Sequence, residues 1–304
     1  MVYSNRCKWC HSMTHYPGNT AVRSTEQLAD SLGQFASDDP SHRLVEVDLE
    51  PEQYDEWHIP GAEHIDWETD INDGLGGKIL GQDEVESLLG DLGITPETTV
   101  VLYGDRANWF AAHAYWVLKY YGHDDVQLLD GGRRKWEMEG YETATETPDF
   151  TEREYTSSEV NDNIRAYKNE VETAMQDETS LIDVRNPQEY RGDKPPAEIP
   201  ETTDREGHIP SADNVPWGQA VDMDGTFKHP KELEDVYNEH IDNECGTISY
   251  CRIGERSSIT WFVLHELLGH DVRNYDGSFS EWEADKDAPV ATNQPASAGT
   301  GGDD

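Results

Sequence analysis

The sequence TISYCRIGERSSITWFVLHELLGH, residues 247–270, places a cysteine loop between a strand-like run and a helix-like run. The first half of the chain contains a matching block, VVLYGDRANWFAAHAYWVLKYYGH, residues 100–123. Tyr103 to His123 spans the same number of residues as Tyr250 to His270. Three further pairs of blocks match in the same order: residues 44–54 and 181–190, 58–67 and 208–217, and 128–141 and 274–286. Repeats this long and this far apart indicate a duplicated domain rather than the short period of a solenoid.

Each half has the sequence pattern of an α/β domain. Residues 181–184 and 247–250 are short apolar runs with the length and β-branched content of strands. Residues 257–268 carry apolar side chains at helical spacing, and Gly269 is a typical helix end. Strand, tight loop and helix in alternation predict the α/β fold class, with two tandem domains that each have a mostly parallel central sheet flanked by helices.

The repeat also sets the expected domain boundaries. We expect one domain over residues 21–145 and a second over residues 161–290, joined by a linker at residues 146–160 that is rich in Thr, Glu and Ser. The polar ends of the chain, residues 1–20 and 291–304, lie outside the repeat. We expect both ends to be disordered, because they contain too little apolar surface to bury.

The chain is strongly acidic: 63 Asp and Glu residues against 23 Lys and Arg residues give a formal net charge of −40. Self-repulsion of this size destabilises a compact state unless salt screens it. Because the acidic residues are spread over the whole chain, we interpret the composition as that of a halophilic protein in a salt-rich cytoplasm. An acidic protein with a basic partner is the alternative. Nucleic-acid binding is disfavoured, since no basic patch interleaved with aromatic residues occurs.

Other sequence features favour a cytoplasmic protein. No apolar run of about 18 residues occurs, so we expect no membrane span. The start of the chain, MVYSNRCKWCHSM, lacks the apolar segment of a secretory signal. Four cysteines in a chain of 304 residues do not suggest a disulfide framework, which favours a reducing compartment.

The loop CRIGER, residues 251–256, is the candidate site. A loop that leaves a strand and enters a helix points backbone N–H groups inward at the positive end of the helix dipole, and such a cradle binds anions. We therefore expect Cys251 to have a lowered pKa and to react as a thiolate. Arg252 and Arg256 add positive charge, and their planar guanidinium groups suit an oxyanion such as a sulfonate. A buried, inert cysteine beside two solvated arginines is the alternative.

The first half of the chain lacks these groups at the matching positions. Gly104 stands where the second half has Cys251, and Asp105 stands where it has Arg252. The other exchanges follow the same pattern: Asn108 for Glu255, Trp109 for Arg256, Glu46 for Asp183 and Asp48 for Arg185. We therefore expect only the second half to be catalytic.

These blocks resemble the tandem-domain rhodaneses, the thiosulfate sulfurtransferase family, over residues 24–290. CRIGERSS followed by WFVL, together with GHIPSADNVPW and VRNYDGSFSEW, is similar to the branch found in actinobacteria and archaea. The resemblance implies a catalytically inactive first domain and a persulfide cysteine, Cys251, in the second. It also implies a ping-pong transfer of sulfur from thiosulfate to cyanide or a thiol acceptor, without a cofactor or a metal.

Further roles follow from the resemblance and the residue types. Substrate binding is expected from four arginines: Arg256, Arg252, Arg185 and, as a weaker candidate, Arg191. Asp183 and Glu255 are expected to anchor the loop through hydrogen bonds or ion pairs. For Arg185, a structural ion pair with a neighbouring carboxylate is an equally good interpretation.

Three other functions are weighed against this one. A cysteine phosphatase uses a loop one residue longer, whereas only four residues separate Cys251 from Arg256, which leaves room for a sulfur atom but little for a phosphate. 3-Mercaptopyruvate is the alternative sulfur donor, and the charged Arg252 favours thiosulfate over it. A non-enzymatic sulfur carrier or rhodanese-like scaffold, which docks a protein acceptor, is the third possibility.

A second group of cysteines and histidines lies in the N-terminal extension: Cys7, Cys10, His11 and His15. It could form half of a zinc site or a redox pair, but the rest of a zinc ligand set is missing locally, so we favour an unstructured extension. Cys245 precedes an expected strand and is expected to be inert. His58 and His208 occupy matched positions in the two halves, so we interpret them as scaffold residues.

Overall fold

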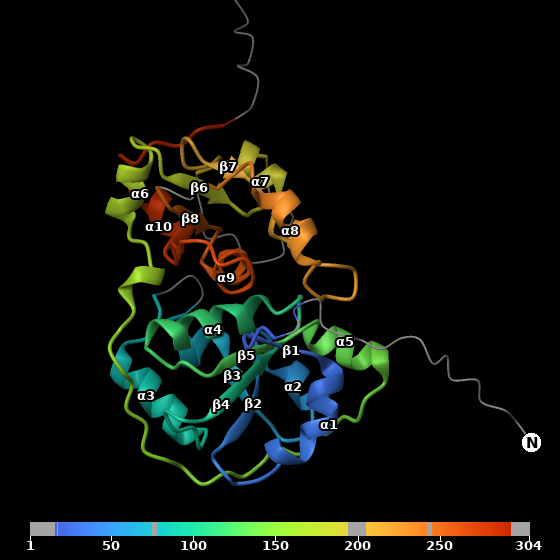
Figure 1. Ribbon diagram of the computed structural model, residues 1–304. Helices are drawn as coiled ribbons and strands as arrows, with labels where there is room; N and C mark the ends of the chain where they lie inside the picture. Colours follow the sequence, from blue (N-terminus) through green and yellow to red (C-terminus); the bar gives the residue numbers. More distant parts are fainter. Residues whose placement is uncertain (1–15, 17, 75–77, 194–204, 242–244, 293–304) are drawn as a thin grey trace, which may run out of the picture.

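The computed structural model describes residue 16 and residues 18–74, 78–193, 205–241 and 245–292. Figure 1 shows two α/β domains stacked one above the other, the first coloured blue to green and the second yellow to red. Each domain has its own central sheet, and the strand pairs in both sheets are parallel. The α/β class with two tandem domains, predicted from the repeat, is confirmed.

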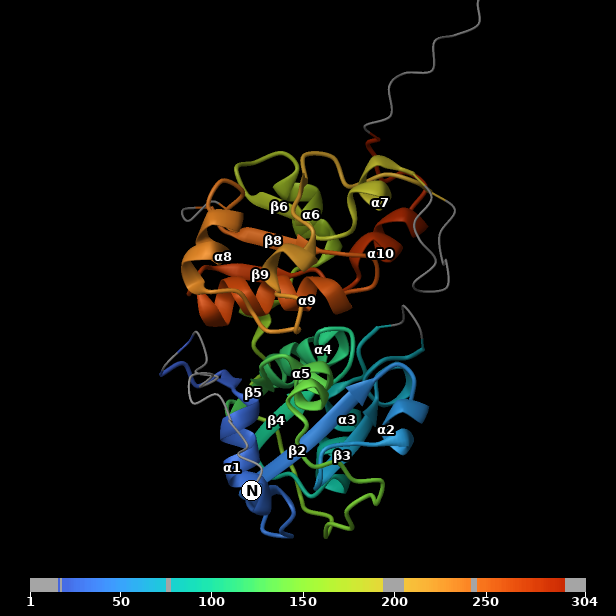
Figure 2. The same cartoon turned by 90° about the vertical axis from the view of Figure 1, so that its right-hand side faces the viewer.

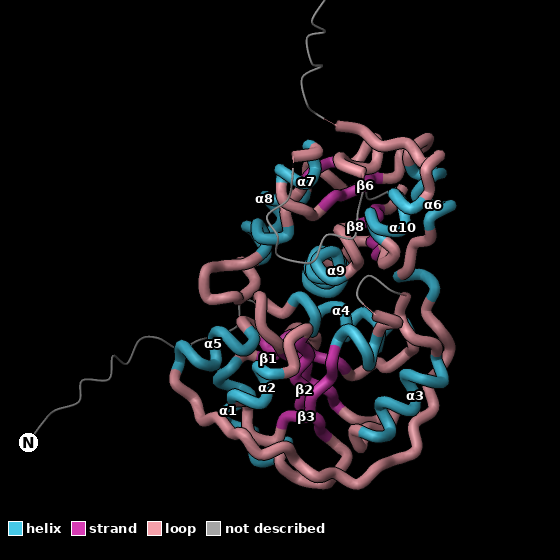
Figure 3. The backbone as a smooth tube through the Cα atoms, turned by 180° about the vertical axis from the view of Figure 1, so that it is seen from behind, coloured by secondary structure: helices cyan, strands magenta, loops and turns pink. Residues whose placement is uncertain are grey.

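The first domain is built on a five-stranded sheet in the order β1-β5-β4-β2-β3. Its strands are β1 (Val22–Arg23), β2 (His42–Asp48), β3 (Ala62–Asp66), β4 (Thr99–Tyr103) and β5 (Val126–Leu129). Its helices are α1 (Thr25–Phe35), α2 (Glu52–Glu56), α3 (Gln82–Asp91), α4 (Trp109–Tyr120) and α5 (Gly132–Glu139), with a π-helical turn η1 (Trp67–Ile71). Helices lie on both sides of the sheet (Figure 3), so the central strands β2 and β4 are buried along nearly their whole length.

The second domain repeats this topology with four strands in the order β7-β6-β8-β9. The strands are β6 (Ser180–Asp183), β7 (Asp213–Asn214), β8 (Thr247–Tyr250) and β9 (Val272–Asn274), and they match β2, β3, β4 and β5. The helical elements are η2 (Asp162–Ile164), α6 (Lys168–Ala174), α7 (Pro187–Arg191), η3 (Trp217–Ala220), α8 (Pro230–Tyr237), α9 (Glu255–Phe262), η4 (Val263–Leu267) and α10 (Ser278–Ala284). A single parallel bridge between Arg165 and Asn274 takes the place of β1.

The helix that follows the cysteine loop differs in detail from the prediction. The sequence predicts it over residues 257–268, whereas α9 already begins at Glu255 and is followed directly by the π-helical segment η4. Gly269 has a φ of +74°, the left-handed conformation typical of a residue just after a helix. Among the described residues, no helix is both long and apolar enough to cross a membrane.

Two buried helices, α4 and α9, form the contact between the domains (Figure 2). The Tyr115 ring packs edge-on against Phe262 with 4.9 Å between ring centroids, and Trp109 packs in the same way against Trp217 at 4.9 Å. One hydrophobic cluster contains residues of both domains. The two domains therefore share a core, because each helix covers apolar surface that the other would leave exposed to water.

The N-terminal side of the first domain also contacts the second domain. Tyr16 is buried and its hydroxyl donates a hydrogen bond to the Lys228 carbonyl. The Asn19 side-chain amide donates to the Glu266 carbonyl at 2.9 Å. The expectation of disorder up to residue 20 is therefore wrong for these residues, whereas residues 1–15 and 17 lie outside the described part of the chain.

The linker and the end of the chain are also attached to the domains. The Arg43 guanidinium lies 4.0 Å from the centroid of the Phe150 ring, which fixes the linker against the first domain. Ala291 forms an antiparallel bridge with His208, so the expectation of disorder from residue 291 onward is wrong for Ala291. Residues 293–304 lie outside the described residues.

Candidate functional site

Cys251 lies directly after β8, at the carboxyl end of the parallel sheet, and α9 begins four residues later at Glu255. Gly254 caps this helix with a φ of +101°, which lets the chain turn sharply. A Cβ atom at Gly254 would lie 2.7 Å from the Asp276 carbonyl oxygen, so only glycine fits. The predicted succession of strand, cysteine loop and helix is confirmed, and the Cys251 side chain is fully buried.

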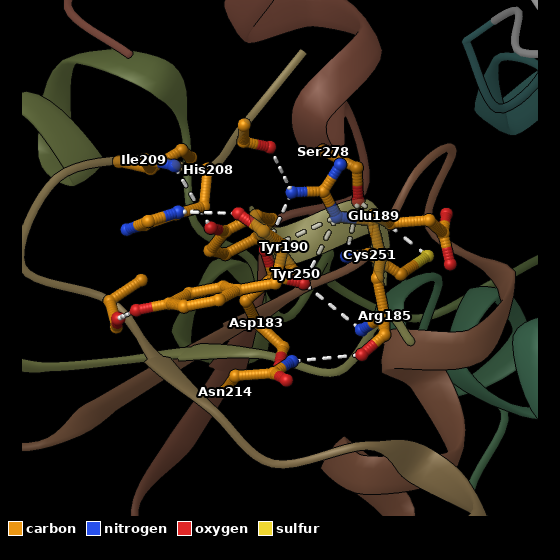
Figure 4. A network of polar contacts seen from close by, with 12 residues as sticks. Asp183, Arg185, Glu189, Tyr190, His208, Ile209, Asn214, Tyr250, Cys251 and Ser278 are labelled. Atoms are coloured by element: carbon orange, nitrogen blue, oxygen red, sulfur yellow. Dashed lines mark hydrogen bonds and ion pairs between the residues drawn. The ribbon is translucent and has the colours of Figure 1, made fainter. Parts of the chain in front are cut away.

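Three groups surround the sulfur of Cys251. The Gly254 N–H donates a hydrogen bond to Sγ at 3.1 Å, and the thiol can donate to Glu255 Oε2, which is 3.2 Å away. The Ser278 hydroxyl lies 3.9 Å from Sγ and accepts a hydrogen bond from the Cys251 N–H at 3.1 Å (Figure 4). The sulfur is therefore held between a main-chain donor and a carboxylate.

The pKa of Cys251 is raised, which corrects the expectation of a lowered value. Burial of the thiol is the largest cause, and the Glu255 carboxylate adds to it. The Arg256 guanidinium and the Ser257 N–H lower the pKa but do not outweigh burial. The thiol form therefore prevails at neutral pH in this structure.

Arg256 is buried and bound by two carboxylates. Its two terminal nitrogens donate to the Glu189 oxygens at 2.9 and 3.1 Å, and its Nε donates to Glu255 at 3.0 Å. Burial alone would lower the pKa of Arg256, but these carboxylates raise it. Arg256 therefore holds Glu255 in place through an ion pair. Contact between Arg256 and a substrate stays a prediction.

Asp183 and Arg185 form a buried ion pair at the end of β6 (Figure 4). Arg185 Nη2 is 2.6 Å from Asp183 Oδ2 and also donates to the Gly207 carbonyl at 2.7 Å. The guanidinium lies 4.1 Å from the centroid of the Phe279 ring. Asp183 thus holds Arg185, and Arg185 connects β6 to the segment around Gly207 and to α10.

The first domain contains an equivalent ion pair. Glu46, at the position of Asp183, binds Arg133, whose guanidinium lies 3.6 Å from the centroid of the Trp57 ring. Arg133 stands at the position of Phe279 in the repeat, so the cation comes from a different element in the two halves. Because the pair also occurs where no cysteine is present, it supports the structural interpretation of Arg185. A contact of Arg185 with substrate stays a prediction.

The two other predicted arginines lie in different surroundings. Arg252 belongs to the cysteine loop; burial lowers its pKa, and the nearby Glu283 carboxylate only partly offsets this effect. Arg191 is 45% exposed and pairs with the exposed Asp193 at 3.1 Å. The structure thus brings Arg252, together with Arg185 and Arg256, close to the loop and places Arg191 at the surface.

Sequence reasoning missed two polar residues of the site, Ser278 and Glu189. Ser278 has a φ of +52°, a conformation that is unfavourable for any residue except glycine, and the repeat has Gly132 with the same φ at that position. Glu189 corresponds to Gln53 in the first half. A comparison of these two positions in the repeat would have revealed both residues, since the carboxylate and the hydroxyl occur only in the half that has the cysteine.

The loop of the first domain has no room for a nucleophile. A Cβ atom at Gly104 would lie 2.4 Å from the Val47 carbonyl oxygen. The Gly104 N–H donates to Asn108 Oδ1 at 3.0 Å, and residues 106–108 all have a positive φ. The exchange of the cysteine for glycine is therefore accompanied by a different loop conformation.

A cavity of about 1350 Å³ opens beside this first-domain loop, between the two domains. Asp105 and Trp109 line it from the first domain, and Trp217 and Met223 line it from the second. The Arg256 guanidinium lies 5.8 Å from the centroid of the Trp109 ring, so this ring contacts both the cavity and the ion pairs around Cys251. The hollow region thus lies next to the cysteine site without including the buried thiol.

The remaining histidines and cysteines fit structural roles. His58 stacks on Tyr54 at 3.9 Å and His208 on Tyr190 at 3.6 Å, and each histidine Nδ1 bonds to the carbonyl of its tyrosine. These identical contacts in both halves support the interpretation of both histidines as scaffold. Cys245 is exposed. The predicted N-terminal group of Cys7, Cys10, His11 and His15 lies outside the described residues, and the residues that are described contain no cluster of three or more metal-ligating side chains.

Both domains match the same family model. The model, described as "Rhodanese-like domain", matches residues 26–139 and again residues 167–285. The first match covers strands β2 to β5, and the second covers strands β6 to β9 and the cysteine loop.

Several known proteins are similar to this chain over most of its length. A protein of Haloferax volcanii named "Putative thiosulfate sulfurtransferase" is 48% identical, over 88% of this chain and 94% of its own. A protein of the same name from Saccharopolyspora erythraea is also 48% identical, over 84% of this chain and 92% of its own. "Sulfur carrier protein TtuD" of Thermus thermophilus is 45% identical, over 84% of this chain and 92% of its own.

Solved structures show the same fold at lower identity. The crystal structure of YnjE superposes with a TM-score of 0.80 at 24% identity and covers 90% of this chain and 69% of its own. The wild-type structure of EanB superposes with a TM-score of 0.79 at 23% identity and covers 91% of this chain and 70% of its own.

The conformation of Gly254 leads to a test of the loop. Gly254→Ala is expected to lower the free energy of unfolding by about 1–3 kcal/mol, because alanine at a φ of +101° is strained and its Cβ would meet the Asp276 carbonyl. Gly218→Ala is the matched control, since its φ is not positive and nothing lies within 4 Å of the added Cβ. Denaturant unfolding of both variants measures the difference. Equal stability of the two variants would show that the loop does not need glycine at this position.

Proposed function

The chain belongs to the rhodanese family, with two rhodanese-like domains, and we propose that it is a thiosulfate sulfurtransferase that carries sulfur as a persulfide on Cys251. The resemblance predicted from the motifs is thereby confirmed at the level of the family. The relatives in Haloferax volcanii and Saccharopolyspora erythraea that are named "Putative thiosulfate sulfurtransferase" support sulfurtransferase activity. The observation that carries the proposal is the hydrogen bond from the Gly254 N–H to Cys251 Sγ at 3.1 Å. The matching loop of the first domain has glycine, Gly104, in place of the cysteine.

The proposed reaction has two steps. The Cys251 sulfur forms a bond to the outer sulfur of thiosulfate, and the bond between the two thiosulfate sulfurs breaks, so that its electron pair leaves with sulfite. In the second step, cyanide or a thiol takes the outer sulfur of the persulfide, and Cys251 returns to its starting state. The Gly254 N–H is placed to stabilise negative charge on sulfur, and burial of the site keeps water away from the persulfide.

We propose that Arg252 contacts the sulfonate end of thiosulfate. Arg252 directly follows Cys251 in the loop, and its planar guanidinium group suits an oxyanion. Arg185 is held in an ion pair with Asp183, and Arg256 is held in ion pairs with Glu189 and Glu255. Arg191, which pairs with Asp193 at the surface, is the least supported of the four predicted arginines.

A second candidate function is that of a sulfur carrier that delivers to a protein. It is supported by the 45% identity to a relative named a sulfur carrier protein. In that case the persulfide on Cys251 forms in the same way, but turnover with small acceptors is slow. The loop of four residues between Cys251 and Arg256 disfavours the phosphatase alternative. No nucleic acid or membrane is proposed as a partner.

We also propose that the protein works in a salt-rich cytoplasm. The formal net charge of −40 supports this setting, because so many like charges on one chain repel each other unless ions screen them. Thiosulfate is itself a dianion, so the same screening would ease its approach to an acidic protein.

The persulfide is tested directly on the cysteine. After incubation of the full chain with thiosulfate, mass spectrometry of the peptide that contains Cys251 is expected to show one added sulfur atom. Cys251→Ser is expected to abolish transfer of sulfur to cyanide, because a hydroxyl group is a much weaker nucleophile, with little change in the free energy of unfolding. Retention of turnover in this variant, or sulfur found on Cys245 instead, would contradict the assignment.

The sulfur donor is tested by parallel rate measurements. With cyanide as the acceptor, kcat/KM is expected to be higher for thiosulfate than for 3-mercaptopyruvate, because the positive charge of Arg252 favours the thiosulfate dianion. Arg252→Gln is expected to reduce kcat/KM for thiosulfate by roughly 10-fold or more, about the effect of one charge-assisted hydrogen bond of 1.5–3 kcal/mol. A preference for 3-mercaptopyruvate would identify that compound as the donor.

The salt requirement is tested by thermal unfolding. We expect Tm to rise steeply as the salt concentration increases toward about 1 M, where the Debye length falls to about 3 Å and the repulsion between acidic side chains is screened. Potassium chloride and sodium chloride are compared so that a specific ion effect can be separated from screening. The same Tm at low and high salt would contradict the halophilic interpretation.

A further inference from the structure

We propose that Glu255 is a catalytic residue that takes the proton of the Cys251 thiol when the persulfide forms and returns it when sulfur leaves. This inference rests on the proposed sulfur transfer. It goes further than the role of loop anchor, because it gives Glu255 a direct part in the chemistry of the sulfur.

The geometry places the carboxylate in contact with the reacting atom. Glu255 Oε2 is 3.2 Å from Cys251 Sγ, within reach of the thiol proton, and its other oxygen accepts from Arg256 Nε at 3.0 Å. The Glu255 and Cys251 side chains are both fully buried. Arg256 fixes one carboxylate oxygen, so the other remains directed at the sulfur, and no water is needed to carry the proton.

The charges around the pair favour movement of the thiol proton within the pair. A carboxylate and a thiolate side by side in a buried site repel each other, and this repulsion is avoided when the proton of Cys251 passes to Glu255. Arg256 of α9 is the other charged group next to this pair. Around Arg256 and the neighbouring Arg252 lie Glu189 of α7, Glu283 of α10 and Arg185, which follows β6. Transfer of the proton to Glu255 creates the nucleophile without adding a second negative charge to this cluster.

The first domain indicates that a structural role alone does not require a carboxylate here. Asn108, the counterpart of Glu255, accepts a hydrogen bond from the Gly104 N–H at 3.0 Å. In the second domain the equivalent N–H, that of Cys251, instead donates to the Ser278 hydroxyl at 3.1 Å. Ser278 has therefore taken over the structural hydrogen bond, which leaves Glu255 to interact with the sulfur.

This exchange involves two positions that depend on each other. At Gly132, the counterpart of Ser278, an added Cβ would lie 2.3 Å from Asn108 Oδ1. A hydroxyl-bearing residue therefore cannot accompany the asparagine in its first-domain position. The second domain has serine and glutamate together, and the serine keeps a positive φ of 52°. Such a paired change, kept despite backbone strain, supports a functional role for both residues.

The proton and the electrons balance over the cycle. In the first half, the thiol proton moves to Glu255, the Cys251 sulfur bonds to the outer sulfur of thiosulfate, and sulfite leaves with the electron pair of the broken S–S bond. This step yields an anionic persulfide and a protonated Glu255. In the second half, cyanide takes the outer sulfur and leaves as thiocyanate, and the Cys251 thiolate recovers its proton from Glu255. No oxidant and no net proton are required.

The pH dependence of Glu255→Gln tests this role in the full chain. In the wild type, persulfide formation from thiosulfate in a single turnover is expected to be nearly independent of pH around neutrality, because the proton stays within the pair. In Glu255→Gln the proton must leave to solvent, so the rate is expected to rise about tenfold per pH unit and to be roughly 10²-fold below the wild type at neutral pH. Glu255→Asp, which keeps a carboxylate, is expected to be slower than the wild type but to keep its flat profile.

The opposite result has a distinct form. If Glu255 only raises the pKa of Cys251 by its charge, the wild-type rate itself will rise with pH. Glu255→Gln will then shift that same profile to lower pH and be as fast or faster at neutral pH, which would overturn the proposal. Glu189→Gln removes the negative charge that pairs with Arg256 but does not alter the contacts of the sulfur. This variant is expected to lower the rate of persulfide formation without introducing the steep pH dependence.

Alkylation separates this proposal from the proposed function. Iodoacetamide reacts with the ionised sulfur and needs no sulfur donor, so the same pH profiles are measured for the Cys251 peptide by mass spectrometry. If alkylation shows the flat wild-type and steep Glu255→Gln profiles but thiosulfate loads no sulfur, the proton transfer stands and the proposed function fails. If thiosulfate loads sulfur but the wild type and Glu255→Gln have the same pH dependence in both assays, the proposed function stands and the role of Glu255 fails.

Discussion

The contact between the buried Cys251 thiol and the buried Glu255 carboxylate is the interaction around which the charged groups of the second domain are arranged. Glu255 lies 3.2 Å from the Cys251 sulfur, and Arg256 compensates its charge. Arg256 in turn donates from its two terminal nitrogens to the two oxygens of Glu189. Three elements must meet to build this group: β8 leads into the cysteine, α9 supplies two of the charges and α7 supplies the third. They meet because β6 and β8 are neighbouring parallel strands whose carboxyl ends lie at the same edge of the sheet.

The duplicated domain separates the features of the fold from those of the site. The stacked histidine and tyrosine and the buried acid–arginine pair occur in both halves, so they belong to the fold. The thiol, its carboxylate and its hydroxyl neighbour occur only in the second half. The first domain has nevertheless kept a part in the site, because α4 packs against α9 and Trp109 lies beside Arg256. Trp109 also lines the cavity between the domains, so the first domain contributes to the surroundings of the ion-pair cluster.

The sequence predicted the α/β class, the tandem domains, the succession of strand, cysteine loop and helix, and the half that lacks the nucleophile. All of these depend on local patterns or on the comparison of the two repeats. The pKa of Cys251 was predicted in the wrong direction. The motif displayed two arginines and a helix start, both of which favour a thiolate, but it did not reveal that the sulfur is fully buried beside Glu255. The ends of the chain were also judged by composition alone, which did not anticipate the burial of Tyr16.

The sequence by itself determined which residue carries the candidate nucleophile and which elements frame it, because strand, turn and helix signals act over a few residues. Only the tertiary structure decided what each charged side chain binds. Glu189 and Arg256 are 67 positions apart, and Cys251 and Ser278 are 27 apart, so no local pattern connects them. The state of the sulfur is set by the sum of burial and of charges that arrive from several elements, and that sum exists only after the sheet and its helices have packed together.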